Sequence, residues 1–286
     1  MKWKRGSKSR DVIDIRGASK GSSGGGSGLP IPGGVGKLGG GSGGGFDLPG
    51  AFGTGATPPG ADNPQPLPPG EDPQADLKDF SSYVFDDTQD VWEGTFDHSG
   101  DPYDTAELVL YSGAVQTGGC GGATSAVGPF YCPADERIYL DLSFYEDMKR
   151  QLGASGDFAW AYVIAHEMGH HVQRMTGTST EVDRLSRSDP GDANELSVRQ
   201  ELQADCYAGV WASTVYADGA LEPGDLDEAF NAAEAVGDDR LQEQATGEVD
   251  PDSFTHGTSE QRRSWFERGY SSGNPADCDT FSVDQL

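Results

Sequence analysis

Residues 158–175 are the most strongly patterned stretch of the chain, and the pattern is that of a helix buried in a core. Apolar or small side chains recur along one helix face, at Phe158, Ala161, Tyr162, Ala165, Met168, Gly169, Val172 and Met175. Gly177 is placed to end this helix after about five turns. His166 and His170 are four residues apart within it, so both imidazoles project from the same side. The sequence therefore predicts a core helix that presents two histidines together.

These histidines belong to the sequence HEMGH at residues 166–170, an HExxH pattern. Zn²⁺ binds imidazole nitrogens, and two imidazoles one helical turn apart can share one tetrahedral ion. Glu167 lies beside them and can reach a metal-bound water without binding the metal itself. The alternative is a histidine pair whose hydrogen bonds are satisfied within the core. His171 projects about 140° around the helix from His166, so we expect it to pack or to lie at the surface.

A catalytic zinc ion needs a third protein ligand and one open position. One extended form of the HExxH pattern adds a third histidine ligand six residues after the second histidine. This chain has Thr176 at that position, so the class of zinc site with three histidines is excluded. Glu195 and Glu201, on a helix predicted over residues 194–216, are the remaining candidates. Glu201 is the better placed, because Asp205 shares its helix face four residues later. Asp205 could then accept a hydrogen bond from a ligand imidazole and fix its tautomer.

The first 73 residues differ in composition from the rest, and we assign them to a disordered tail. Residues 1–20 are basic, residues 21–60 are rich in glycine and serine, and residues 57–73 are rich in proline. Such segments lack the apolar content of a core and act as flexible or extended spacers. The alternative is a basic tail that contacts a partner or a lipid. The folded domain is predicted to span residues 74–286.

The acidic composition limits the partners of the chain. It contains 47 acidic against 20 basic residues, a net charge of -27, whereas nucleic-acid binding needs a basic face. The same charge disfavours docking on anionic membranes. We find no run of about 20 apolar residues that could span a membrane. The basic start is not followed by the apolar segment of a secretory signal.

Around the core helix, the pattern predicts an α+β domain that is mostly helical. Helices are expected at residues 75–93, 143–153, 194–216, 225–236, 238–245 and from 258 onward, and strands at 107–112 and 137–142. Residues 178–192 are polar and are expected to form a loop. Ser143 with Glu146, and Thr258 with Gln261, have the spacing of capping boxes at helix starts.

Four cysteines, Cys120, Cys132, Cys206 and Cys278, allow two disulfides in three possible pairings. In an oxidising compartment we favour Cys120 with Cys132, which closes a Gly-rich loop, and Cys206 with Cys278, which pins the C-terminal tail. In the cytoplasm, buried free thiols are the norm. The expected location is thus the cell envelope or the exterior if the cysteines are oxidised, and otherwise the cytoplasm. The chain has no CxxC pair, which argues against a zinc ribbon.

Several stretches together resemble the bacterial "putative neutral zinc metallopeptidase" family. They are AYVIAHEMGHHVQ, RQELQADCYAGVWA, SFTHGTSEQRRSWFERGY and GPFYCPADERIYLDLSFY, within residues 76–281. The resemblance implies a zincin-like domain with a small antiparallel sheet and peptide or protein substrates. It also implies one catalytic Zn²⁺ held by His166, His170 and Glu201, with Glu167 as acid/base. Many members of the family have a basic start, glycines and a membrane-spanning helix; this chain lacks the apolar helix.

The segment FTHGTSEQR also resembles integral-membrane zinc proteases, in which a histidine stabilises the tetrahedral oxyanion. This resemblance makes His256 a candidate catalytic residue, since developing charge on a carbonyl needs a donor aimed at it. The alternative is a histidine that orders the loop before the last helix. Arg262 and Arg263 are expected to form salt bridges or to be solvated.

Taken together, these features predict a zinc-dependent endopeptidase whose substrate adds to an edge strand, for which residues 107–112 are our candidate. Two alternatives remain. One is a catalytically silent zinc- or protein-binding module on the same scaffold, and the other is a structural protein that works through its Gly-rich region. The intact Glu167 favours the enzyme, because metal binding alone does not need it.

Overall fold

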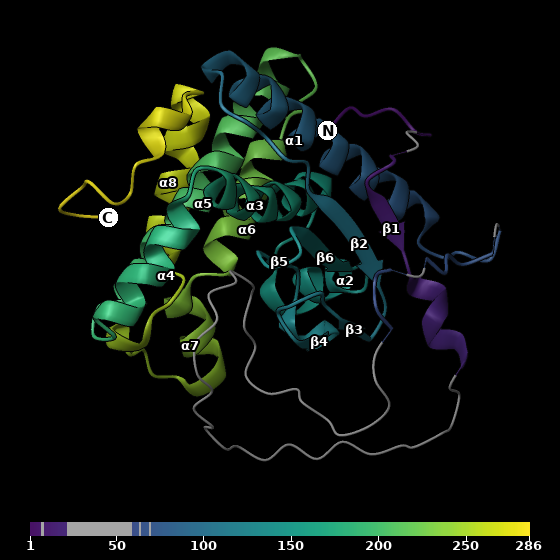
Figure 1. Ribbon diagram of the computed structural model, residues 1–286, viewed down its shortest axis with the longest axis horizontal. Coiled ribbons are helices and arrows are strands. Elements are labelled where there is room, and N and C mark those ends of the chain that lie inside the picture. Colours follow the sequence, from purple (N-terminus) through teal and green to yellow (C-terminus); the bar gives the residue numbers. More distant parts are fainter. Residues whose placement is uncertain (7–8, 22–58, 63, 69) are drawn as a thin grey trace.

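The computed structural model describes residues 1–6, 9–21, 59–62, 64–68 and 70–286 of the 286-residue chain (Figure 1). Over these ranges, its strands are β1 (Val12–Asp14), β2 (Glu107–Tyr111), β3 (Ala114–Gln116), β4 (Gly122–Thr124), β5 (Phe130–Cys132) and β6 (Arg137–Asp141). Its α-helices are α1 (Ala75–Ser99), α2 (Phe144–Asp147), α3 (Asp157–Met175), α4 (Thr178–Ser188), α5 (Ala193–Ala217), α6 (Asp225–Ala235), α7 (Asp238–Thr246) and α8 (Ser259–Ser272).

The main sheet is mixed and has the strand order β1-β2-β6-β5. β1 and β2 are parallel, β2 and β6 are parallel, and β5 runs antiparallel to β6. The sheet thus contains the expected antiparallel pair but is not antiparallel throughout. β3 and β4 form a separate antiparallel pair. β2 lies inside the main sheet, so our prediction that residues 107–112 form its edge is wrong.

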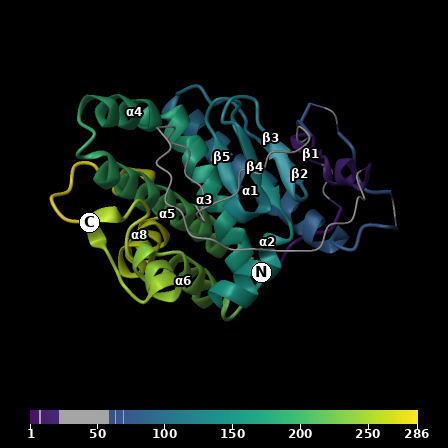
Figure 2. The ribbon, with the colours of Figure 1, turned by 90° about the horizontal axis from the view of Figure 1, so that it is seen from below.

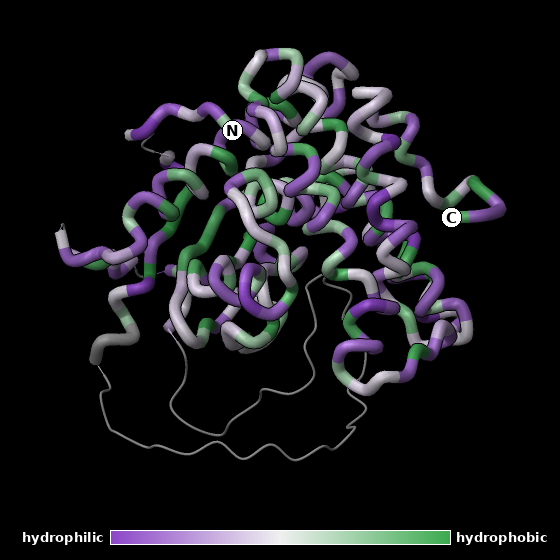
Figure 3. Tube along the Cα trace, turned by 180° about the vertical axis from the view of Figure 1, so that it is seen from behind, coloured by the Kyte–Doolittle hydropathy of each residue, from purple (hydrophilic) through white to green (hydrophobic). Residues whose placement is uncertain are grey.

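Helix α3 lies between the sheet and the helices α4, α5, α6 and α8. Figures 1 and 2 show α4, α5, α6 and α8 on one side of it and the strands on the other. Sixteen of its nineteen residues are buried, which explains the nearly continuous apolar character of its sequence. Figure 3 shows hydrophobic segments in the strands and hydrophilic ones along the outer turns. Among the described helices, none combines the length and the apolar character needed to cross a membrane.

Glycines let three helices approach one another closely around this centre. A Cβ added at Gly169 of α3 would lie 2.9 Å from the carbonyl oxygen of Ala204 in α5. Gly209 of α5 and Gly269 of α8 each lie against the backbone of the other helix, where no Cβ would fit. A residue with a side chain would push these helices apart. The glycines therefore fix how α3, α5 and α8 present their polar residues to one another.

The start of the chain is part of the fold, which corrects the predicted tail. β1 pairs with β2, and the following Ile15 is fully buried. Arg16 is also buried and forms ion pairs with Asp14 and Asp72, at 2.7 and 2.6 Å. A short apolar stretch is enough to complete a sheet edge, but its signal is lost in the average composition of residues 1–73. The prediction for residues 22–58 lies outside the described residues.

Most other elements match their predicted positions, with three local differences. Residues 178–192 contain helix α4 rather than only a loop. The helix was not predicted, because Val182 is its only buried apolar residue and the periodicity is therefore faint. The Ser143 side chain makes no capping hydrogen bond, and α2 continues into a π-helical turn over Met148–Leu152. α1 extends to Ser99, beyond the predicted end at residue 93. The predicted capping box of Thr258 and Gln261 is confirmed at the start of α8.

Candidate metal centre

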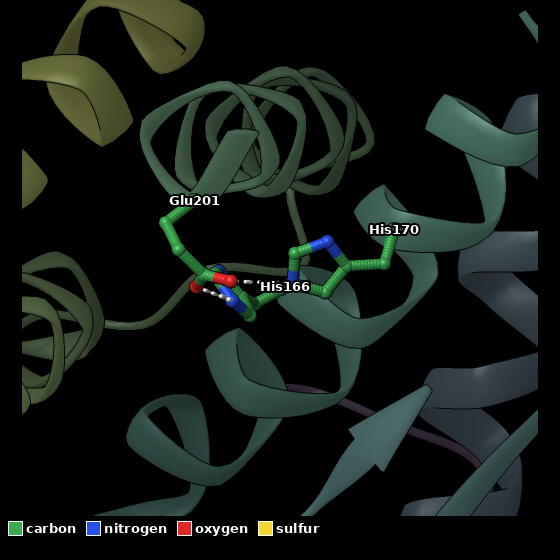
Figure 4. A group of neighbouring side chains, drawn as sticks. All are labelled: His166, His170 and Glu201. Carbon is green, nitrogen blue, oxygen red and sulfur yellow. Dashed lines mark hydrogen bonds and ion pairs between the residues drawn. The ribbon is translucent and has the colours of Figure 1, made fainter. Parts of the chain in front are cut away.

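Two turns of α3 and one turn of α5 bring His166, His170 and Glu201 together (Figure 4). Their candidate ligand atoms all lie within 4.8 Å of one another, and all three residues are buried. His166 Nε2 is 3.1 Å from Glu201 Oε2, and His170 Nε2 is 3.4 Å from Glu201 Oε1. Two imidazole nitrogens facing a carboxylate form a donor set that suits zinc.

The other ring nitrogen of each histidine has a defined partner. His166 Nδ1 lies 2.8 Å from Asp205 Oδ1, and His170 Nδ1 lies 2.9 Å from Gln173 Oε1. Both partners are acceptors, so each Nδ1 carries a proton and donates it. The Nε2 atoms are then the ones that a cation would bind. Such outer partners orient ligand rings in metal sites, so the arrangement fits a metal ion.

The charges around the site favour cation binding. Burial raises the pKa of Glu201, but the nearby His170 and His166 lower it by more than burial raises it, and the net shift keeps this carboxyl ionised. Burial lowers the pKa of His170 to about 4, so that imidazole is neutral. Burial also lowers the pKa of His166, but Asp205 and Glu201 raise it to about 9. A cation at His166 Nε2 would displace a proton, since metal binding and protonation compete.

Glu167, next to His166, is a buried residue whose side chain makes no hydrogen bond. Its side chain is fully buried, and neither carboxyl oxygen has a hydrogen-bond partner. Burial raises its pKa to about 8, and the charges of His166 and Arg262 oppose this shift only in part. Buried polar groups almost always have partners. A buried carboxyl without a partner is therefore unusual, and this one lies next to His166 in α3.

Asp205 is the centre of a buried polar network behind His166. Arg262 of α8, fully buried, donates from Nε to Asp205 Oδ2 at 2.8 Å and from a terminal nitrogen to Oδ1 at 3.0 Å. The hydroxyl of Tyr162 donates to the same Oδ1 at 2.5 Å. Burial raises the pKa of Asp205, but Arg262 and His166 lower it below its ordinary value. Asp205 is thus an ionised acceptor that holds His166 in place.

His256 lies in the loop before α8 and is held by Asp238. The backbone N–H of His256 donates to Asp238 Oδ2 at 2.6 Å, and its Nδ1 is 3.2 Å from Oδ1. Burial lowers the pKa of His256, but the hydrogen bond to Asp238 and the charge of Glu201 raise it overall. His256 is not in the group of three that could hold a metal. It is oriented beside that group, and Asp238 fixes its Nδ1 side.

Other residues considered from the sequence lie outside the group. His171 is buried, with Nδ1 3.0 Å from the Tyr131 hydroxyl and Nε2 2.7 Å from the Asp104 carbonyl oxygen, so it packs rather than facing solvent. Glu195 is exposed and pairs with Arg199 at 2.8 Å. Cysteines pair as favoured from the sequence, with Cα–Cα distances of 5.9 Å in Cys120–Cys132 and 5.5 Å in Cys206–Cys278.

Sequence reasoning missed three residues of the site: Tyr162, Gln173 and Gln203. Tyr162 is one helical turn before His166, and Gln173 is three residues after His170, so both share the face of α3 that carries the histidines. Helical spacing could have found these two. Nothing in the sequence distinguishes Gln203 from the neighbouring Gln200.

Comparisons with known proteins agree with this geometry. The family model described as "Putative neutral zinc metallopeptidase" matches residues 1–281. The uncharacterized protein YpfJ of Escherichia coli (strain K12) is 49% identical over 290 residues, which cover 98% of this chain and 99% of YpfJ. The uncharacterized protein Rv2575 of Mycobacterium tuberculosis (strain H37Rv) is 48% identical over 195 residues, 64% of this chain and 65% of Rv2575. No solved structure matches the chain. The family match over almost the whole length shows that the chain belongs to the putative neutral zinc metallopeptidase family.

Proposed function

We propose that this protein is a zinc-dependent endopeptidase. The observation that carries the proposal is the convergence of His166, His170 and Glu201 beside the buried, unpartnered carboxyl of Glu167. A bound zinc ion would supply a Lewis acid and an activated water. The family description supports both the metal and the class of reaction.

In this mechanism Glu167 is the general base. Neither of its oxygens is engaged by another group. The positive charge of a bound cation would lower the raised pKa of Glu167 and leave it as a carboxylate that can accept a proton from the attacking water. The same group then delivers the proton to the leaving amine. His166, His170 and Glu201 would hold the metal, and Asp205 keeps the His166 ring oriented for this role. His256 is our candidate for the donor that stabilises the oxyanion.

We assign the substrate to the edge of the sheet formed by β5. Among the described strands, β5 is the last in the order β1-β2-β6-β5 and pairs only with β6. It packs against α3, the helix that carries Glu167, and the hydroxyl of its Tyr131 lies 3.0 Å from Nδ1 of His171 in that helix. An extended peptide added along this edge would run beside the base. This assignment replaces the one to residues 107–112.

Zinc content and cleavage of denatured casein, measured for the wild type and for Glu167→Gln, test the proposal. We expect both proteins to contain about one zinc ion per chain, and only the wild type to cleave. Zinc binding without any cleavage in the wild type would favour the silent zinc- or protein-binding module. Cleavage that survives Glu167→Gln would rule out the proposed base.

We further propose that the protein works in an oxidising compartment, at the cell envelope or outside the cell. The support is the pairing of all four cysteines at disulfide distance, which is typical of such compartments. A thiol count on native protein from its own cells tests this. We expect no reactive thiol after denaturation; four thiols would place the protein in the cytoplasm.

A further inference from the structure

The two histidines of the metal centre donate to acceptors of different kinds. His166 donates to a carboxylate, Asp205, whereas His170 donates to the neutral amide oxygen of Gln173. A carboxylate has two equivalent acceptor atoms, but an amide has one acceptor end and one donor end. The amide of Gln173 can therefore orient His170 only if something determines which end faces the ring.

Two neighbours determine the orientation of the Gln173 amide. Its Nε2 lies 2.7 Å from the backbone carbonyl oxygen of Gln200 and 3.1 Å from Oε1 of Gln203. A backbone carbonyl can only accept, so the nitrogen end of Gln173 must face α5. Its oxygen must then face His170, whose Nδ1 has to carry the proton. The Nε2 atom of His170 is thereby left to face Glu201.

The orientation of Gln203 is set in the same way. Its Nε2 donates to the backbone carbonyl oxygen of Cys278 at 3.0 Å, which turns its Oε1 toward Gln173. Cys278 is fully buried and is joined by a disulfide to Cys206 of α5. The residues after Cys278 are also attached to α5, because the buried Thr280 hydroxyl donates to the Arg199 carbonyl oxygen at 2.7 Å.

These contacts form one directional chain of hydrogen bonds, from His170 through Gln173 and Gln203 to the carbonyl of Cys278. We propose that Gln173 and Gln203 are positioning residues for His170. The Cys206–Cys278 disulfide anchors the far end of the chain, so zinc affinity depends on this bridge. The proposal rests on the metal site of the proposed function and does not depend on peptide hydrolysis.

The test is the zinc dissociation constant of the full-length protein, measured by competition with a chromophoric chelator. Removal of an outer partner of a metal ligand typically weakens metal binding about 10–100-fold. We expect that loss for Gln173→Met and a loss of about tenfold for Gln203→Met. Gln200→Met is the matched control. This variant removes a buried side-chain amide from α5, which donates to the Ser179 hydroxyl at 3.4 Å, but keeps the backbone carbonyl of residue 200 that accepts from Gln173.

The disulfide is tested by a second pair of variants. Cys206→Ser with Cys278→Ser should weaken zinc binding, whereas Cys120→Ser with Cys132→Ser should leave it unchanged. In the cobalt-substituted protein, the visible spectrum should shift in the variants that weaken zinc binding and not in Gln200→Met. If a cysteine variant does not fold, Gln203→Met decides.

Two results would overturn the proposal. One is a wild type and a Gln203→Met protein that bind zinc equally well, and the other is a Gln200→Met protein that loses as much affinity as Gln203→Met. A wild type that binds no zinc would instead overturn the metal centre and, with it, the proposed function.

Discussion

Asp205 is the residue at which the charges of the site are balanced. It is fully buried and accepts hydrogen bonds from His166, Tyr162 and Arg262. Taking a carboxylate out of water costs several kcal/mol, and only paired partners offset that cost. The ion pair with Arg262 is therefore a condition for Asp205 to stay ionised beside the metal ligand.

Arg262→Met should reduce the free energy of unfolding by about 3–5 kcal/mol, because it leaves the Asp205 charge buried without its counter-ion. Arg263→Met is the control. Arg263 is 42% exposed and pairs with Glu234 at the surface, so its loss should cost at most about 1 kcal/mol. Urea denaturation of the three proteins measures both effects. Equal midpoints for the two variants would contradict the role of Arg262.

Glu201→Ala should lower the zinc stoichiometry and abolish cleavage, because it removes one of three ligands, the carboxylate, and leaves only two imidazoles. Glu195→Ala should change neither, since Glu195 is exposed and pairs with Arg199. Both residues lie on α5, so any general effect on that helix would appear in both variants. Metal analysis by mass spectrometry, with the casein assay, makes the comparison. Full zinc and activity in Glu201→Ala would show that the ligand set is wrong.

His256→Ala should keep zinc bound and lower kcat by roughly 10²–10³-fold, the usual effect of losing one oxyanion donor. The reason is its fixed orientation, with Asp238 on its Nδ1 side and Glu201 close enough to raise its pKa. Steady-state kinetics and zinc content measure the effect, with the exposed His98→Ala as control. A lower melting temperature with unchanged kcat would assign His256 to ordering the loop instead.

The sequence was sufficient to predict the residues whose chemistry follows helical spacing. His166, His170 and Glu201 were predicted as a group, and the structure brings them together. Gln203 was not predicted, because its role depends on a contact with Cys278, 75 residues away. The burial of Arg262 was not predicted for the same reason, because it depends on Asp205, 57 residues away. A residue that works through a distant partner leaves no local pattern.

At the level of elements, the close packing of α3 on α5 brings the histidines to Glu201. Gly169, inside the HEMGH sequence, is a point of close approach, because its missing side chain leaves room for the backbone of Ala204. The spacing between the two helices therefore sets the size of the metal site. Because Gly169 belongs both to the HEMGH sequence and to the contact with α5, a change in helix packing at this residue also changes the metal site.

Gly169→Ala should lower the free energy of unfolding by about 1–3 kcal/mol, the usual cost of overpacking a core. It should also weaken zinc binding, because α5 would have to move away with Glu201. Gly94→Ala in α1 is the control. Nothing lies within 4 Å of an added Cβ there, so it should be neutral or stabilise by up to about 1 kcal/mol. Urea denaturation and chelator competition measure the two effects. If the two variants have the same free energy of unfolding and the same zinc affinity, this explanation is wrong.

Elements with strong periodicity were predictable, and those that depend on a neighbour were not. β2 and β6 were found by their alternating residues, but their order in the sheet was not, because β1 covers the free edge of β2 from a position near the start of the chain. α4 was missed because only Val182 marks its buried side among apolar residues. The expected antiparallel sheet came from the family resemblance; within the main sheet it holds for β5 with β6, and β3 with β4 form a separate antiparallel pair.

At the scale of the whole molecule, two segments far apart in sequence are joined next to β1. The backbone N–H of Gly17 donates to the carbonyl oxygen of Gln65 at 2.7 Å, and the N–H of Gln65 donates to that of Asp14 at 2.9 Å. Arg16 links the same place to Asp72. These contacts, with the pairing of β1 and β2, attach residues 9–21 to the rest of the described fold through non-covalent bonds.

A chain cut once between residues 22 and 58 should therefore remain a single particle assembled from two fragments. A protease site inserted there, cleaved after folding, should give two bands under denaturing conditions and one peak in native gel filtration. Dissociation of the short fragment at micromolar concentration would contradict this. If it stays bound, a synthetic peptide of the first 21 residues could be supplied separately, and the protein could be made to assemble, and be switched on, by adding its own first strand.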